Sequence, residues 1–125
     1  MKAGDTFRRK DSQDKHLWVV MYITKHHPEE CVLVNLTSNR DYKDQSCTLE
    51  SGDHPFIAHS TVVNYGGATK ALRQAIIREL KKGTIIQEES CSLSVLKRIR
   101  EGALVTRQKP LWLKEMLERY ANPNK

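Results

Sequence analysis

The sequence lacks the features of several protein classes. It has no uninterrupted apolar run of about 18 residues, the length that a membrane-spanning helix needs, and no apolar signal segment follows residues 1–5. Its three cysteines, Cys31, Cys47 and Cys91, are odd in number and widely spaced, which favours reduced, buried thiols over a disulfide framework or a paired zinc site. We therefore expect a cytoplasmic protein with no membrane segment and no metal or other cofactor.

Motifs for nucleophilic catalysis and metal binding are also missing. There is no Gly-x-Ser-x-Gly elbow and no suitable Cys/His setting, so a hydrolase with a nucleophilic serine or cysteine is disfavoured. His26 and His27 are adjacent, but no third ligand lies at a helpful spacing from them. We expect residues 25–30 to form an exposed turn.

The chain, with 125 residues of which 38% are hydrophobic, is long enough for one domain with a modest core. Its charge is unevenly divided, because residues 1–66 hold eight Lys/Arg and nine Asp/Glu, whereas residues 67–125 hold thirteen and six. All five histidines lie in the first half. A basic second half attracts a polyanion, although a merely solvated basic face has the same composition.

Stretches rich in β-branched and aromatic residues predict about five short strands in the first half of the chain. They are residues 4–10, 16–23, 31–37 and 46–49 and a bent stretch over 56–65. Phe7 is expected to face inward, and the second and third strands to pair as an antiparallel hairpin. This series predicts a small barrel or a strongly coiled sheet, with a bulge near His59 and Ser60.

Helical spacing of apolar residues begins after Gly66-Gly67. A first helix is expected from Thr69, which can cap it, to Gly83, which can end it. Residues 84–86 are then expected to return to the edge of the sheet. No internal repeat or low-complexity linker interrupts this part of the chain.

Two further helices are expected after residue 90. The second begins at Ser92 or Ser94, and the third has Pro110 in its first turn. Their expected inward residues are Leu93, Leu96, Ile99 and Ala103 in the second helix, and Leu113, Met116, Leu117 and Tyr120 in the third. The expected outward residues of the second helix are Lys97, Arg98 and Arg100. This basic face could follow a nucleic-acid backbone or simply keep the protein soluble.

The order of these elements resembles that of the MazF/PemK-like toxins of type II toxin–antitoxin systems, over residues 4–68. Gly4-Asp5 stands where that family begins its first strand, and residues 16–20 resemble its second strand. Residues 34–38 resemble its third strand, which ends in a Thr/Ser pair. His59-Ser60 falls near the position of the family's Asp-Gln. The resemblance implies an α+β fold with an SH3-like barrel in residues 1–68 and a basic helical extension over residues 69–125. It also implies endoribonuclease activity, an antitoxin partner and a homodimer.

The resemblance assigns Thr37 and Ser38 to the RNA phosphate. It also shows one departure, because the family's arginine before the second strand is replaced by His16, with Lys15 beside it. Either His16, Lys15 or Arg40 takes over the charge of this arginine, or the barrel no longer cleaves RNA.

Two histidines near the end of the predicted barrel suit metal-free RNA cleavage. That reaction uses the neighbouring 2′-hydroxyl as nucleophile and needs a base, an acid and groups that stabilise the phosphorane. An ordinary histidine pKa of about 6.5 lets one ring be neutral while another is protonated. His54 and His59 can converge if Pro55 or a bulge turns the chain. His16 would join them if the second strand borders the last one.

We therefore expect a toxin-like endoribonuclease that cleaves single-stranded RNA and is restrained by an antitoxin. The expected catalytic residues are His59, His54 and His16, and the expected RNA-binding residues are Thr37, Ser38, Arg40, Lys97, Arg98 and Arg100. The alternative is a non-catalytic SH3-like barrel module that binds nucleic acid or a protein partner. The two differ in whether His54 and His59 face one pocket together with Thr37.

Overall fold

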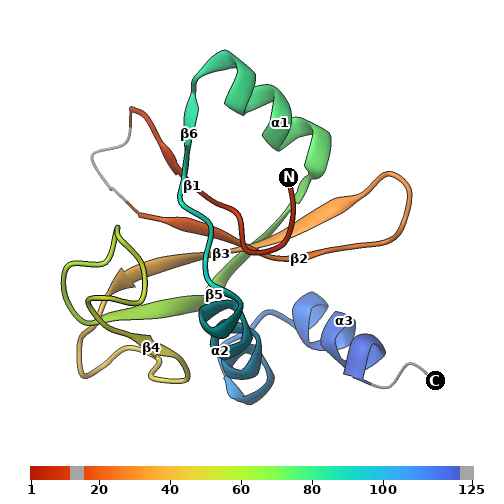
Figure 1. The fold of residues 1–125 in the computed structure, drawn as a ribbon. Helices are drawn as coiled ribbons and strands as arrows, with labels where there is room; N and C mark the ends of the chain where they lie inside the picture. The colour runs from red at the N-terminus through yellow and green to blue at the C-terminus, as the bar shows by residue number, and fades with distance from the viewer. Residues whose placement is uncertain (12–15, 122–125) are drawn as a thin grey trace.

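The computed structural model describes residues 1–11 and 16–121, and Figure 1 shows a curled sheet with helices on both of its faces. In this part of the chain the strands are β1 (Thr6–Arg9), β2 (Trp18–Ile23), β3 (Glu30–Ser38), β4 (Thr48–Leu49), β5 (Thr61–Leu72) and β6 (Ile85–Glu88). The helices are α1 (Arg73–Lys82), α2 (Leu93–Val105) and α3 (Leu111–Ala121). The expectation of an α+β chain is confirmed.

The six strands form one antiparallel sheet in the order β4-β5-β3-β2-β1-β6. Register shifts interrupt the β2–β3 ladder between Val20 and Tyr22 and the β3–β5 ladder between Leu33 and Asn35. Such bulges increase the local twist and bend of a sheet. The sheet curls into a half-barrel. β4 and β6 are its two edge strands, and within the described residues they are not paired with each other. The SH3-like assignment stays a prediction.

The two faces of the sheet pack against different helices. On one face, α2 and α3 contribute Val95, Ile99, Ala103, Leu113 and Leu117 to a core that also contains Leu17, Val19, Val34, Leu36, Val63 and Tyr65. On the other face, Ile76 of α1 packs against Phe7, Val20, Cys31 and Leu33. The inward direction expected for Phe7 is therefore confirmed. Among the described residues, no helix combines the length and the apolar content that a membrane crossing requires.

The end of β5 differs from the prediction. β5 continues through Gly66 and Gly67 to Leu72, so Thr69 lies within the strand and the expected helix cap at Thr69 is wrong. The second half of β5 pairs with the first half of β3, and this long-range ladder outweighs the local helical spacing. At its other end, α1 does stop at Gly83, which has a positive φ of 78° and whose N–H reaches the carbonyls of the last turn.

The remaining elements agree with the prediction in type and order, with several exceptions. The expected bulge near His59 and Ser60 is wrong, because both residues precede β5 and the register shifts lie between Val20 and Tyr22 and between Leu33 and Asn35. Residues 56–58 form part of a turn and not of a strand, and Leu93 is 86% exposed, so its expected inward direction is wrong. Arg98 and Arg100 depart in part from the expected outward direction, for reasons given below. Ser92 caps α2 by accepting from the Val95 N–H at 3.1 Å, and β6 returns to the edge of the sheet beside β1. The side chain of Tyr120 lies outside the described part.

Candidate functional site

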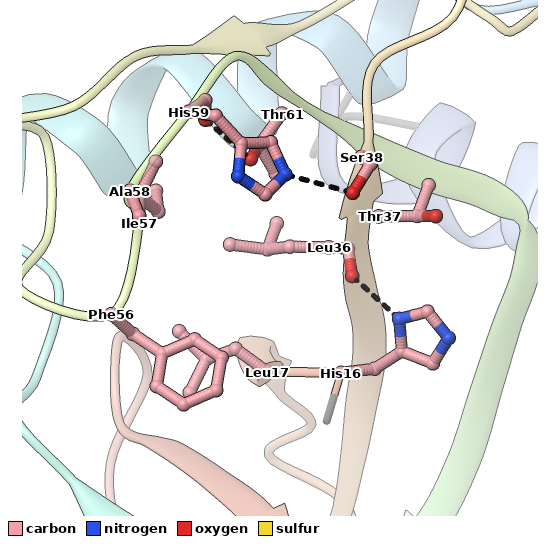
Figure 2. A pocket seen from close by; sticks show the side chains of 10 residues that line it. All are labelled: His16, Leu17, Leu36, Thr37, Ser38, Phe56, Ile57, Ala58, His59 and Thr61. Carbon is pink, nitrogen blue, oxygen red and sulfur yellow. Dashed lines mark hydrogen bonds between the residues drawn. The ribbon is translucent and has the colours of Figure 1, made fainter. Parts of the chain in front are cut away.

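The end of β3 and the turn before β5 enclose a pocket of about 260 Å³ (Figure 2). Its lining residues are His16, Leu17, Leu36, Thr37, Ser38, Phe56, Ile57, Ala58, His59 and Thr61. The register of the sheet positions the two walls, because Ser38 pairs directly with Thr61 and the Asn39 N–H donates to Ser60 O at 3.0 Å. The pocket is slightly smaller than typical ligand pockets of roughly 300–1,000 Å³, so it suits part of a nucleotide better than a whole cofactor.

A hydroxyl–imidazole pair lies at this pocket. Ser38 Oγ and His59 Nε2 are 2.8 Å apart, and the imidazole of His59 is exposed. Thr61 Oγ1 donates to His59 O at 2.9 Å, which fixes the backbone that carries the ring. When Nε2–H donates to Ser38 Oγ, the lone pair on Nδ1 is available as a base. Figure 2 shows this second nitrogen pointing away from Ser38.

His16 reaches the same pocket by a route that the sequence did not predict. β3 lies between β2 and β5, so the expectation that the second strand borders the last one is wrong. His16 Nδ1 is 3.0 Å from Leu36 O, and because a carbonyl only accepts, Nδ1 carries the hydrogen. Figure 2 shows His16 and Thr37 on one side of β3, with His59 and the Leu36 side chain on the other.

His54 does not converge with His59, so that expectation is wrong. Its side chain is only 4% exposed and lines a separate pocket together with Asp53 and Ser90. Its Nδ1 accepts from the Phe56 N–H at 3.0 Å, so Nε2 must carry the hydrogen that is donated to the Glu89 carbonyl. Both ring nitrogens therefore hold backbone in place, and neither is available to exchange a proton with a substrate.

Lys43 is a cation beside this site that sequence reasoning missed, and it lines an adjoining pocket that shares Thr37 with the first. Its Nζ donates to Thr37 Oγ1 at 3.0 Å and to Ser38 O at 2.7 Å. Arg40, the cation that was predicted, is exposed and bonds to Asn39 O at 2.7 Å. The position of Lys43 six residues after Thr37, in a loop that must fold back on the strand end, is a signal that could have identified it. The other candidate, Lys15, lies outside the described residues.

A second hydrogen-bonded chain fixes the turn that carries His59. Asn39 Nδ2 donates to Ser60 Oγ at 3.1 Å, and Ser60 Oγ donates to Glu50 Oε1 at 3.1 Å. Asn39 Oδ1 in turn accepts from Gln45 Nε2 at 2.7 Å. These contacts join three segments of the chain, so the pocket wall is held by side chains as well as by the β-ladder.

The basic face of α2 divides into one exposed and two anchored cations. The Lys97 side chain is 78% exposed, as expected. Arg98 instead bonds to Asp53 Oδ1 at 3.0 Å and to Thr48 O at 2.7 Å. Arg100 lies 4.5 Å from the centre of the Tyr22 ring and donates to a backbone carbonyl of β2. Both arginines attach α2 to the sheet, so the expected outward direction is met only in part, with 41% of the Arg98 side chain exposed.

Neither carboxylates nor Lys or Arg side chains of the described residues line the pocket. At least one Asp or Glu lines each of four other pockets on the described part of the chain. Burial raises the pKa of the Cys91 thiol to about 11 and also raises the pKa values of Cys31 and Cys47, so none of the three is a ready nucleophile. Among the described residues, no three His, Cys, Asp or Glu side chains are grouped to hold a metal ion.

Comparisons with known proteins found no match to a protein-family model, to a curated protein or to a solved structure.

Proposed function

We propose that this chain cleaves single-stranded RNA by acid–base chemistry in the pocket between β3 and the turn at residues 55–60. The observation that carries the proposal is the Ser38–His59 pair, 2.8 Å apart, in a pocket that a second imidazole also lines and that no carboxylate lines. Phosphodiesters are anionic, so the absence of lining carboxylates removes a source of repulsion.

His59 is proposed as the group that takes the proton from the ribose 2′-hydroxyl. Its exposed ring can approach a bound strand, and Ser38 orients the ring through Nε2. Proton abstraction lets the 2′-oxygen attack the adjacent phosphorus and form a 2′,3′-cyclic phosphate. A positioned base of this kind contributes roughly 10²–10⁴-fold to a rate.

The second proton transfer is assigned to His16. Because its Nδ1–H is directed to Leu36 O, a proton gained by the ring resides on Nε2. His16 lies on the other side of β3 from His59, so this assignment requires an RNA strand that crosses the end of β3 and places its leaving 5′-oxygen on the His16 side. Lys43, whose Nζ donates to the backbone carbonyl of Ser38, supplies a positive charge that stabilises the negatively charged phosphorane. Lys43 is thereby proposed for the role of the arginine that the resembling family carries before its second strand. The toxin-like role and the antitoxin are also proposals and rest on the resemblance alone.

The direct test incubates the purified protein with end-labelled single-stranded RNA in excess chelator and resolves the products on a gel. We expect cleavage with 2′,3′-cyclic phosphate ends. His59→Ala should lower turnover by roughly 10²–10⁴-fold without a change in thermal midpoint. His54→Ala is the matched control, because it should lower the midpoint and leave the turnover of the folded fraction unchanged. Activity that disappears in chelator and returns with a divalent ion would reject the mechanism.

A second candidate function is RNA binding without cleavage. His54 favours this candidate, because both of its ring nitrogens are hydrogen-bonded to the backbone. One of the three predicted catalytic histidines is therefore absent from the pocket. This candidate predicts a gel shift with intact RNA and no product in the same assay.

A further inference from the structure

A second pocket adjoins the proposed site of cleavage and shares Thr37 with it. Its volume is about 310 Å³, and the residues that line it include Tyr42, Lys43, Asp44, Asn64 and Gln108. We call it the Tyr42 pocket. Figure 2 shows Thr37 and His16 on the side of β3 away from His59. An RNA strand that crosses the end of β3 toward Thr37 therefore reaches the Tyr42 pocket.

Tyr42 presents an open aromatic ring from a fixed turn. It is 82% exposed and lines the pocket. The turn that carries it is closed by the Lys43 N–H, which donates to Arg40 O at 2.9 Å. Gln45 Nε2 lies 3.0 Å from the same carbonyl and 3.1 Å from Lys43 O. An exposed ring on a fixed backbone offers a large contact area for stacking at a low cost in conformational entropy.

Two side-chain amides line the pocket together with this ring. Asn64 Oδ1 accepts from the Gly67 N–H at 3.2 Å, which orients the amide. Within the described part of the chain, neither Asn64 Nδ2 nor the side-chain amide of Gln108 makes a hydrogen bond. Each amide group of this kind carries donors or acceptors that match the edge of a nucleic-acid base.

The two charged groups of the pocket favour different parts of a nucleotide. Lys43 Nζ uses two donors on Thr37 Oγ1 and Ser38 O, and because an ammonium has three, one remains for a phosphate oxygen. Both oxygens of Asp44 accept hydrogen bonds, from the hydroxyls of Ser46 and Thr106. The negative charge of this carboxylate repels a phosphate, so the space beside it suits the uncharged base.

We propose that the Tyr42 pocket binds an unpaired RNA base, stacked on the Tyr42 ring with its edge toward the amides of Asn64 and Gln108. The proposal rests on the proposed function. The leaving 5′-oxygen is assigned to the side of β3 on which Thr37 lies, so the base belongs to the nucleotide that follows the scissile phosphate. Unpaired RNA bases are recognised by stacking on aromatic rings and by hydrogen bonds to their edges.

Tyr42→Ala tests the stacking contact. Binding is measured by the anisotropy of a fluorescein-labelled 12-nucleotide 2′-O-methyl RNA, which lacks the nucleophile and cannot be cleaved. We expect the affinity to fall about 5- to 150-fold, the effect of losing one base–aromatic stack, with an unchanged thermal midpoint because the ring is exposed. Tyr42→Trp should retain the wild-type affinity. Leu93→Ala is the matched control, because it truncates a side chain that is 86% exposed at the start of α2 and should leave the affinity unchanged.

The results separate this proposal from the proposed function. Wild-type affinity in Tyr42→Ala, or an equal loss in Leu93→Ala, would overturn the Tyr42 pocket as a base site even if the protein cleaves RNA. An affinity that depends on Tyr42, in a wild-type protein that leaves RNA intact, would support the pocket and overturn only the proposed enzyme activity. No anisotropy change for the wild-type protein would overturn both.

Gln108→Ala tests the contact with the base edge. Gln108 is exposed and its side-chain amide has no partner among the described residues, so the thermal midpoint should not change. The affinity should fall about two- to tenfold, the usual effect of losing one hydrogen bond. The same substitution should cost less in the Tyr42→Ala protein, because a base that is no longer stacked is not held against the amide. Equal losses in both backgrounds would overturn the assignment of the two residues to one base.

Discussion

Gly102 lies in α2 where the helix approaches the sheet too closely for a side chain. A Cβ at this position would lie 2.2 Å from Tyr65 Oη and 2.8 Å from Cys47 Cβ. Both neighbours are buried, and Tyr65 Oη donates to Ile99 O at 2.6 Å. We therefore expect Gly102→Ala to destabilise the fold, although alanine is the better helix former.

The size of the effect follows from three contributions, one that stabilises the variant and two that destabilise it. The higher helix propensity of alanine favours the variant by about 1 kcal/mol. Overpacking a filled core costs about 1–3 kcal/mol. Displacing the Tyr65 hydroxyl from Ile99 O leaves a buried donor without an acceptor, which costs about 1–3 kcal/mol more. The expected loss in the free energy of unfolding is therefore about 1–5 kcal/mol.

Urea unfolding followed by circular dichroism measures this loss, and Tyr65→Phe is the matched background. Without the hydroxyl, the nearest Tyr65 atom to the new Cβ would be the ring carbon at 3.0 Å in place of the oxygen at 2.2 Å. Gly102→Ala should therefore cost at least about 1 kcal/mol less in the Tyr65→Phe protein. A more stable Gly102→Ala protein, or the same cost in both backgrounds, would refute this account of how α2 packs.

Three other predictions concern single substitutions. The pKa of Asp53 is lowered by the hydrogen bond from the Glu50 N–H and by Arg98, so the ionised carboxylate stabilises the folded state fully above the ordinary pKa of about 3.9, and this stabilisation is lost as the pH falls further. Asp53→Asn should therefore flatten the dependence of the thermal midpoint on pH in that acidic range. An unchanged dependence would exclude this role for Asp53. Arg100→Ala should lower the free energy of unfolding by about 1–3 kcal/mol because it removes a cation–π contact and a hydrogen bond, whereas Lys97→Ala should change it by less than about 0.5 kcal/mol in the same urea titration. Gly83→Ala should cost about 1–2 kcal/mol in thermal unfolding because φ is 78°, and an equal stability would contradict the left-handed cap.

Local patterns predicted the elements that local contacts stabilise. The β2–β3 hairpin, the end of α1 at Gly83 and the cap at Ser92 all depend on residues close together in the sequence. The boundary between β5 and α1 was not predictable in this way. The residues near Thr69 can continue a helix, but they pair with Leu33 and its neighbours, some 36 positions earlier in the chain.

The candidate site shows the same division. Ser38 and His59 were identified from residue type and position, and the structure brings them together. The position of His54 could not be predicted, because it depends on a carbonyl at residue 89, which is 35 positions away. The contacts of Arg98 are likewise long-range, since Asp53 is 45 positions away. Periodicity alone shows which face of a helix a residue occupies. It does not show which residue of another element that face contacts.

The pairing of β1 with β6 joins the first and the last strand of the chain across a long stretch of sequence. Thr6 pairs with Glu88, and beyond the ladder the Cys91 N–H donates to Gly4 O at 2.8 Å. During synthesis, β1 and β2 leave the ribosome long before residues 85–91 do. An unpaired strand edge invites pairing with another chain. The nascent protein therefore passes through a period in which the outer edge of β1 is open to intermolecular association, and this period ends only when the segment between α1 and α2 has emerged.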